Sequence, residues 1–248
     1  MANKKLNLLR RFLFWRVRHI SDRNFILMLS IVIGLAVGFS AVVIKNSVYF
    51  IEYLLTSGFT VNYQNYLYFI YPSVGLFATI IFIRYVLRQN VGHGIPSVLY
   101  SISKTNGHIK RHNVFSSIIT SALTVGFGGS VGLEGPTVAT GGAIGSNLGR
   151  MLHLNSKQII SLVGFACAGA MAAIFKAPIT AVVFVLEVIM LDLTMSAIVP
   201  LLMASVTAAL TSYFFMGQDV LYPFVLKEEF MIKDVPYYII FGIFAGLI

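Results

Sequence analysis

Long, mostly apolar runs alternate with short polar segments along most of this chain. The runs cover residues 24–44, 66–88, 113–133, 158–175 and 193–217. A helix needs about 20 predominantly apolar residues to cross the roughly 30 Å hydrocarbon core of a bilayer. The pattern therefore predicts a series of membrane-spanning helices.

Other apolar segments are too short to span or are interrupted by glycine and proline. Val91–Ser103 contains a Gly-x-Gly-x-Pro break, after which a short helix is expected to begin near Ser97. Residues 135–152 are rich in glycine and alanine, and Pro178 suits the first turn of a helix that ends at Leu191. Backbone that leaves a helix inside a bilayer must be buried in protein or line a wet cavity. Such breaks indicate an ion site.

Composition agrees with this pattern, since only 11% of residues are charged, 57% are hydrophobic and the mean hydropathy is +0.84. A soluble domain carries about 25% charged residues. The chain is therefore expected to be an all-α integral membrane protein that crosses the membrane several times. The aromatic and polar segment Lys45–Tyr66 is expected to form an external interfacial connection.

The net charge of +9 comes largely from the start of the chain. Basic residues near the ends of spans mark the cytoplasmic side, so the N-terminus is predicted to be cytoplasmic, in a cell inner or plasma membrane. This placement indicates membrane lipids as partners and does not indicate nucleic acid. Residues 1–23 have apolar positions at helical spacing, which predicts an amphipathic segment on anionic headgroups; a disordered basic tail is the alternative. The basic residues on this side are Lys4, Lys5, Arg10, Arg11, Arg16, Arg18, Arg23, Lys104, Lys110 and Arg111.

No enzyme or cofactor motif is found in the sequence. HExxH and GxSxG motifs are absent, and the five histidines do not cluster with acids at metal-ligand spacing. The chain is therefore expected not to be an enzyme and to need no cofactor or metal. The lone Cys167 is expected to be a small core residue.

The strongest candidate site lies in the glycine-rich segment Gly128–Arg150, where glycines and Pro136 surround Glu134. A glycine turn that leads into a helix N-terminus exposes several backbone N–H groups, which bind anions without a formal cation. For the small residues Gly141–Gly145 close helix packing is the alternative explanation.

Glu134 itself is a carboxylate in an apolar region, and such residues mark ion pathways or proton relays in membranes. An ionised carboxylate placed where an anion binds competes with that anion, whereas a protonated one does not have to stay there. Glu134 is therefore predicted to be a proton-sensitive plug. A glutamate on an interfacial loop is the alternative.

Three motifs resemble those of CLC chloride channels and exchangers. GLEGP (132–136) resembles their G-[K/R]-E-G-P signature, GHGIP (92–96) resembles their GSGIP filter, and IFKAPITAVVFVLEVIM (174–190) resembles the segment that follows. The resemblance runs from about Asp22 to the chain end. It implies tilted and discontinuous transmembrane helices, a homodimer with one pore per subunit, and Glu134 as the gate. It also implies anion contacts from His93, Gly94, Ile95, Pro96, Gly132, Leu133 and Gly135.

Some positions depart from the family pattern. His93 replaces a serine, so its imidazole either donates to the anion or turns to the cytoplasm while backbone amides bind. Leu133 replaces a basic residue. Glu187 matches an acidic family position, and it either lies on a proton pathway or is a buried, paired structural acid. Val188 replaces the proton-transfer glutamate of many exchangers. These positions favour a voltage-gated-type chloride channel gated by a protonatable glutamate, with a proton-coupled chloride antiporter, or a relative with another anion preference, as the alternative.

The family pore has two inverted halves, and the second supplies a GxFxP motif and a pore tyrosine that this chain lacks. Residues 24–248 are therefore expected to be the first inverted-repeat half only. The chain ends inside an apolar tract that begins near Val235, so we expect it to be truncated.

Overall fold

The computed structural model describes residues 16, 18–56, 64–89, 91–92, 94–189, 197–217 and 231–247. They belong to two compact units, Met1–Gln218 and Asp219–Ile248. The described residues contain helices and no strand, which confirms the predicted all-α fold. The helices of the first unit are α2 (Asp22–Thr56), α3 (Gln64–Ile81), α4 (Gly94–Lys104), α5 (Asn113–Gly126), α6 (Glu134–Met151), α7 (Ser156–Phe175), α8 (Pro178–Phe184) and α9 (Ile198–Met216), with π-helical segments η1 (Phe82–Leu87) and η2 (Val185–Ile189); the second unit contains η4 (Ile232–Asp234) and α10 (Val235–Leu247).

Four described helices are long and apolar enough to cross a membrane: Asp22–Thr56, Ile70–Leu87, Ser156–Phe175 and Ile198–Met216. They confirm the membrane spans predicted over residues 24–44, 66–88, 158–175 and 193–217. Asn113–Gly126 and Pro178–Ile189 are apolar but shorter. Residues 1–15 and 17, which include most of the predicted amphipathic segment, lie outside the described part of the chain.

The prediction that Lys45–Tyr66 form an interfacial connection is wrong for residues 45–56, because these residues belong to α2, which continues to Thr56. Lys45 is only 4% exposed, and its ammonium nitrogen lies 5.6 Å from the centroid of the Tyr49 ring. Its aliphatic stem is therefore packed like an apolar side chain, and Ile44 and Val48 continue the buried face of the helix. One charge does not end a helix whose apolar face goes on.

Two further boundaries differ from the prediction. The short helix after the first glycine break, α4, begins at Gly94 and not near Ser97, because Pro96 falls within its first turn, where no intrahelical N–H bond is needed. The span predicted to end at Leu133 ends at Gly126. The following chain turns through Gly128, whose φ of +86° favours glycine.

Local signals explain where the later helices begin. Asn155 and Gln158 form a capping box at the start of α7, with Asn155 Oδ1 accepting from the Gln158 amide at 2.9 Å. Lys176 ends that helix in the left-handed region, at φ +55°. Pro178 then occupies the first turn of α8, as predicted. The chain therefore re-enters a helix after a two-residue break.

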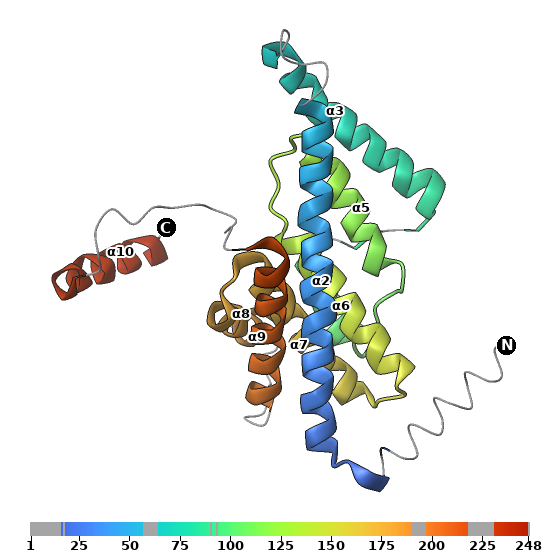
Figure 1. The fold of residues 1–248 in the computed structure, drawn as a ribbon, viewed down its shortest axis with the longest axis vertical. Helices are drawn as coiled ribbons and strands as arrows, with labels where there is room; N and C mark the ends of the chain where they lie inside the picture. Colours follow the sequence, from blue (N-terminus) through green and yellow to red (C-terminus); the bar gives the residue numbers. More distant parts are fainter. Residues whose placement is uncertain are drawn as a thin grey trace. The chain divides into compact units, whose positions relative to one another are not determined.

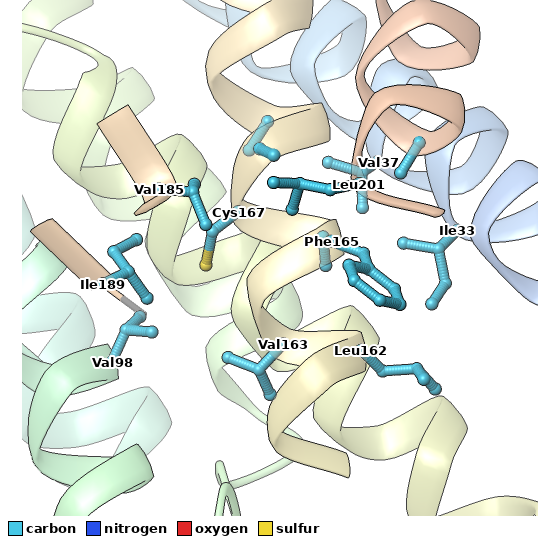
Figure 2. Close-up of a cluster of buried hydrophobic side chains, with 14 of the residues drawn as sticks. Ile33, Val37, Val98, Leu162, Val163, Phe165, Cys167, Val185, Ile189 and Leu201 are labelled. Atoms are coloured by element: carbon cyan, nitrogen blue, oxygen red, sulfur yellow. The ribbon is translucent and has the colours of Figure 1, made fainter. Parts of the chain in front are cut away.

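Helix α7 is the centre of the first unit and packs against α2, α6, α8 and α9. In Figure 1, α2 lies between α5 and α6 on one side and α9 on the other. Figure 2 shows side chains from several helices meeting around α7, among them Phe165, Leu162 and Leu201. Cys167 is fully buried in this cluster, which confirms its predicted role as a core residue.

Helices α6 and α7 approach closely through glycine. A Cβ atom added to Gly145 would lie 2.5 Å from the backbone oxygen of Leu162. We expect Gly145→Ala to lower the free energy of unfolding by about 1–3 kcal/mol, because overpacking against backbone cannot relax by a rotamer change. Thermal unfolding of the full-length protein measures this. Gly142→Ala is the control and should cost less, because its Cβ would meet side-chain atoms and no backbone: methyl groups of Val98 and Ile109 at 3.2 and 3.3 Å and the Cys167 sulfur at 3.4 Å. Equal losses would contradict the packing explanation.

Candidate functional site

The first glycine motif forms a turn that leads directly into α4. Gly94 adopts φ +54°, and its amide donates to the Gly92 carbonyl at 3.1 Å. Pro96 has no N–H, and the Ser97 hydroxyl donates to the Gly94 carbonyl at 2.7 Å. The amide of Ile95 has no acceptor among the described residues. It is therefore free to bind a ligand at the helix N-terminus.

The second glycine motif leads into α6 in a similar way. Leu133 is the N-cap residue and makes no side-chain capping bond. Its carbonyl is used instead, accepting from the Thr137 amide at 3.0 Å and from the Thr137 hydroxyl at 2.6 Å. Pro136 lacks an N–H, so the amides of Glu134 and Gly135 are the unpaired donors of this N-terminus within the described chain.

The two helix N-termini meet. A Cβ atom added to Gly94 would lie 3.1 Å from the Cα atom of Gly135, so the two backbones are in contact and a side chain at position 94 would separate them. Each N-terminus carries roughly half a positive charge from its helix dipole. The free amides of Ile95, Glu134 and Gly135 therefore belong to one electropositive site built without a formal cation.

The Glu134 side chain folds back over Gly132. A Cβ atom on Gly132 would overlap the Oε2 atom of Glu134 and lie 2.7 Å from its Cδ atom. Helix N–H groups point toward the N-terminus, and Gly132 lies just before it, so the carboxylate is held at the electropositive end of α6. Among the described residues it makes no hydrogen bond or ion pair. Glycine at position 132 is required for this side-chain position.

The structure thus brings together most of the residues predicted for the anion site: Gly94, Ile95, Pro96, Gly132, Leu133, Glu134 and Gly135. Leu133 is 7% exposed, so its apolar side chain is packed in the interior. His93 lies outside the described residues, and its predicted contact with the anion remains a prediction.

Glu187 and Val188 lie in η2, and both are exposed in this chain. The two predicted roles of Glu187, on a proton pathway or as a buried, paired acid, stay predictions. Gly141 and Gly145 face α7, where a Cβ on Gly141 would lie 2.8 Å from the backbone oxygen of Ala166. Close packing explains these two glycines, and the anion site does not extend to them.

Asn113 is a neighbour of the site that the sequence did not indicate. A Cβ on Gly92 would lie 3.8 Å from its Nδ2 atom, while its Oδ1 atom is buried without a partner in the described chain. The preceding His112 is buried. Its burial is the larger cause, and the charge of Lys110 the smaller cause, of a lowered pKa of its imidazole.

No group of three potential metal ligands occurs among the described residues.

The chain belongs to the voltage gated chloride channel family, whose family model matches residues 74–248. This confirms the family that the three sequence motifs resemble.

Individual relatives agree with this assignment. The chain is 31% identical over 179 residues to chloride channel protein CLC-d of Arabidopsis thaliana, covering 64% of this chain and 23% of that one. It is 26% identical over 169 residues to an uncharacterised protein of Methanocaldococcus jannaschii, covering 68% of this chain and 42% of that one. The crystal structure of a CLC-type fluoride/proton antiporter superposes with a TM-score of 0.70 at 25% identity, covering 90% of this chain and 55% of that one. The chain therefore spans about half of that antiporter's length, and less of the curated relatives.

Proposed function

We propose that the protein containing this chain moves anions across a membrane, with chloride as the first candidate, and that Glu134 gates the pathway. One observation carries the proposal: two helix N-termini touch through Gly94 and Gly135, and the Glu134 carboxylate is folded against Gly132 at the same place. An ionised carboxylate there competes with an anion for the free amides. Protonation removes its charge and releases the site.

Fluoride is the second candidate ion, because the solved relative at 25% identity is a fluoride/proton antiporter. The test is uptake of chloride and of fluoride by liposomes that contain the full-length protein, beside protein-free liposomes. The proposal predicts protein-dependent uptake of at least one of the two ions, with chloride preferred. Uptake no faster than in protein-free liposomes for both ions would contradict it.

We propose passive, channel-like movement, with proton-coupled exchange as the alternative. Val188 cannot carry a proton, and the resemblance to CLC exchangers implies that it replaces the proton-transfer glutamate of many of them. A chloride gradient across liposomes is therefore expected to drive no uphill proton movement, measured with a pH-sensitive dye inside the vesicles. Proton uptake at a fixed ratio to chloride would favour exchange and would direct attention to the exposed Glu187.

The N-terminus is proposed to be cytoplasmic, and the full-length protein is proposed to be a homodimer with one pathway per subunit. The first proposal is supported by the basic residues on one side of the spans. The second is supported by the resemblance to CLC proteins, which implies a homodimer. Light scattering of the detergent-solubilised protein would test the dimer, and a monomeric mass would contradict it.

A further inference from the structure

Helix α5 buries hydroxyl groups and exposes large apolar residues. Ser116, Ser117 and Ser121 are buried, whereas Phe115 and Ile119 are exposed. Small residues let two membrane helices approach closely, so close packing alone would explain a serine face. A buried polar group that lacks a partner beside this face requires another explanation, because packing does not satisfy its hydrogen bonds.

Thr140 on α6 is such a group. It is fully buried, and its Oγ1 atom has no hydrogen-bond partner among the described residues. A threonine inside a helix can donate to the carbonyl four residues before it. Other helical threonines of this chain do so, among them Thr79, Thr120, Thr137, Thr207 and Thr211. Since Thr140 does not, its hydroxyl is left for a buried water molecule, the usual partner of an unsatisfied buried polar group.

Helix geometry places Thr140 on the side of α6 that faces α2 and α5. A Cβ atom on Gly141 would lie 2.8 Å from the backbone oxygen of Ala166 on α7, and one on Gly142 would lie 3.2 Å from Val98 on α4. Successive residues are about 100° apart around a helix, so Thr140 lies on the other side of Gly141 from Gly142. Helix α6 also packs against α2 and α5, which are therefore its neighbours on the Thr140 side (Figure 1).

The same side of α6 carries polar groups on either side of Thr140. Asn147 lies about two helical turns further along, and its buried Oδ1 atom has no partner within the described chain. In the other direction, Thr137 is fully buried and donates to the carbonyl of Leu133, and its oxygen can still accept a hydrogen bond. Glu134 follows Leu133 directly. The rise from Thr140 to Glu134 is about 9 Å, a distance that roughly three hydrogen-bonded water molecules span.

A titratable group lies at the other end of the serine face. The Nδ1 atom of His112 is 3.4 Å from the Ser116 hydroxyl, and its Nε2 atom is buried without a partner in the described part of the chain. A neutral imidazole accepts a hydrogen bond at one nitrogen and donates from the other, which suits the transfer of protons. Burial, and to a smaller extent the charge of Lys110, lowers the pKa of this ring and so favours its neutral form.

Lys110 is the charge that acts on His112 from its own turn. Helix α5 packs against α2, α3, α6 and η1. Apart from tyrosines, α3 has no titratable residue, and no ion pair with His112 is found among the described residues. The acids and bases on the other three elements are Asp22, Arg23, Lys45 and Glu52 on α2, Arg84 in η1, and Glu134 and Arg150 on α6.

We propose that water molecules held between α5 and α6 form a relay that carries the gating proton to Glu134 from the side of the membrane where His112 lies. A proton enters at the water beside His112, and O–H bonds and hydrogen bonds exchange along the relay. At the far end one O–H bond forms on the Glu134 carboxylate, which becomes neutral, and the reverse sequence returns the proton; no electron is transferred. This inference rests on the proposed gating role of Glu134 and adds the side and the residues through which it is protonated.

The test is the speed of opening after a pH step, because a relay changes how fast Glu134 gains a proton and not how strongly it holds one. The full-length protein is inserted in one orientation into planar bilayers, and the pH is lowered on the His112 side. Thr140→Val keeps the side-chain shape and removes the hydroxyl, so it should slow the rise of anion current by about tenfold or more. The pH at which the steady current is half-maximal should stay the same.

Two variants control for packing. Thr140→Ser keeps the hydroxyl and should open at nearly the wild-type rate, although it loses a methyl group. Thr124→Val makes the same change on α5, where the hydroxyl lies 3.2 Å from that of Thr79 on α3, and it should also keep the wild-type rate. Thr140→Val should fold, since it replaces a buried hydroxyl that has no protein partner with an apolar group of the same shape. Its thermal unfolding is measured beside its current.

The relay and the gate fail in different ways. A Thr140→Val protein that opens as fast as the wild type, or a Thr124→Val protein that is slowed equally, would overturn the relay while the wild type still opens on acidification. A wild-type current that does not respond to pH on either side would overturn the proposed gate itself. A crystal structure of the full-length protein should show an ordered water molecule bound to Thr140 Oγ1, and a dry interface there would also contradict the relay.

Discussion

Replacing Glu134 with glutamine is expected to remove the pH dependence of anion flux. The ionised carboxylate and an anion about 4 Å away repel each other by roughly 4 kcal/mol at an effective dielectric constant of 20, enough to favour exclusive occupancy by nearly a thousandfold. Flux through the wild type should therefore rise at least about tenfold from about pH 7.5 to about pH 4.5. Glu134→Gln should show the high flux throughout, because it keeps the shape of the side chain and loses its charge.

Glu134→Ala extends the same test. It removes the bulk of the side chain together with its charge, so flux should be at least as high as in Glu134→Gln at every pH. The readout is flux in liposomes that contain the full-length protein, with all three forms measured in parallel. If Glu134→Gln keeps the wild-type pH dependence, the gate lies at another residue.

Gly132→Ala is expected to open the pathway at neutral pH without touching the glutamate. The added Cβ would overlap Oε2 of Glu134, so the ionised side chain has to leave the position in which it is folded against residue 132. The far end of a glutamate side chain can move, and the variant should therefore fold. Flux at neutral pH should rise about tenfold or more, toward that of Glu134→Gln, because the same repulsion is relieved.

Gly242→Ala is the control for this variant, because Gly242 belongs to α10 and is not a residue of the anion site. A Cβ there would have no heavy atom within 4 Å, so flux should change by less than about twofold. The double variant Gly132→Ala/Glu134→Ala should behave like Glu134→Ala alone, since residues that act through one another are not additive. Additive effects, or equal effects of the two glycine variants, would show that Gly132 acts only through packing.

The sequence was informative where the signal is local. Gly132 and Pro136 around Glu134 predicted a helix N-terminus, and α6 begins at Glu134. Pro178 predicted the first turn of a helix, and α8 begins at Pro178. In each case a few neighbouring residues determine the backbone conformation, so a short motif is enough to place a helix start and the side chain it carries.

Features that depend on contacts between distant segments could not be predicted. The contact of Gly94 with Gly135 joins two motifs on different helices, and the approach of Asn113 to Gly92 joins residues that are about 20 positions apart in the sequence. The length of α2 was underestimated because Lys45 has the charge of a span boundary, and only the tertiary packing shows that its stem is buried. A helix boundary predicted from charge alone is therefore wrong where the stem of a long charged side chain can be buried by tertiary packing.

The central claim is that the Glu134 carboxylate and a transported anion compete for the amides at the two helix N-termini. Anomalous diffraction from crystals of the full-length protein soaked in bromide, a substitute for chloride, measures this competition directly. We predict a bromide peak beside the amides of Ile95 and Gly135 in Glu134→Gln and in wild-type protein at acid pH, and a much weaker peak in wild-type protein at neutral pH. Equal peaks in all three, with the carboxylate still folded against Gly132, would contradict the claim.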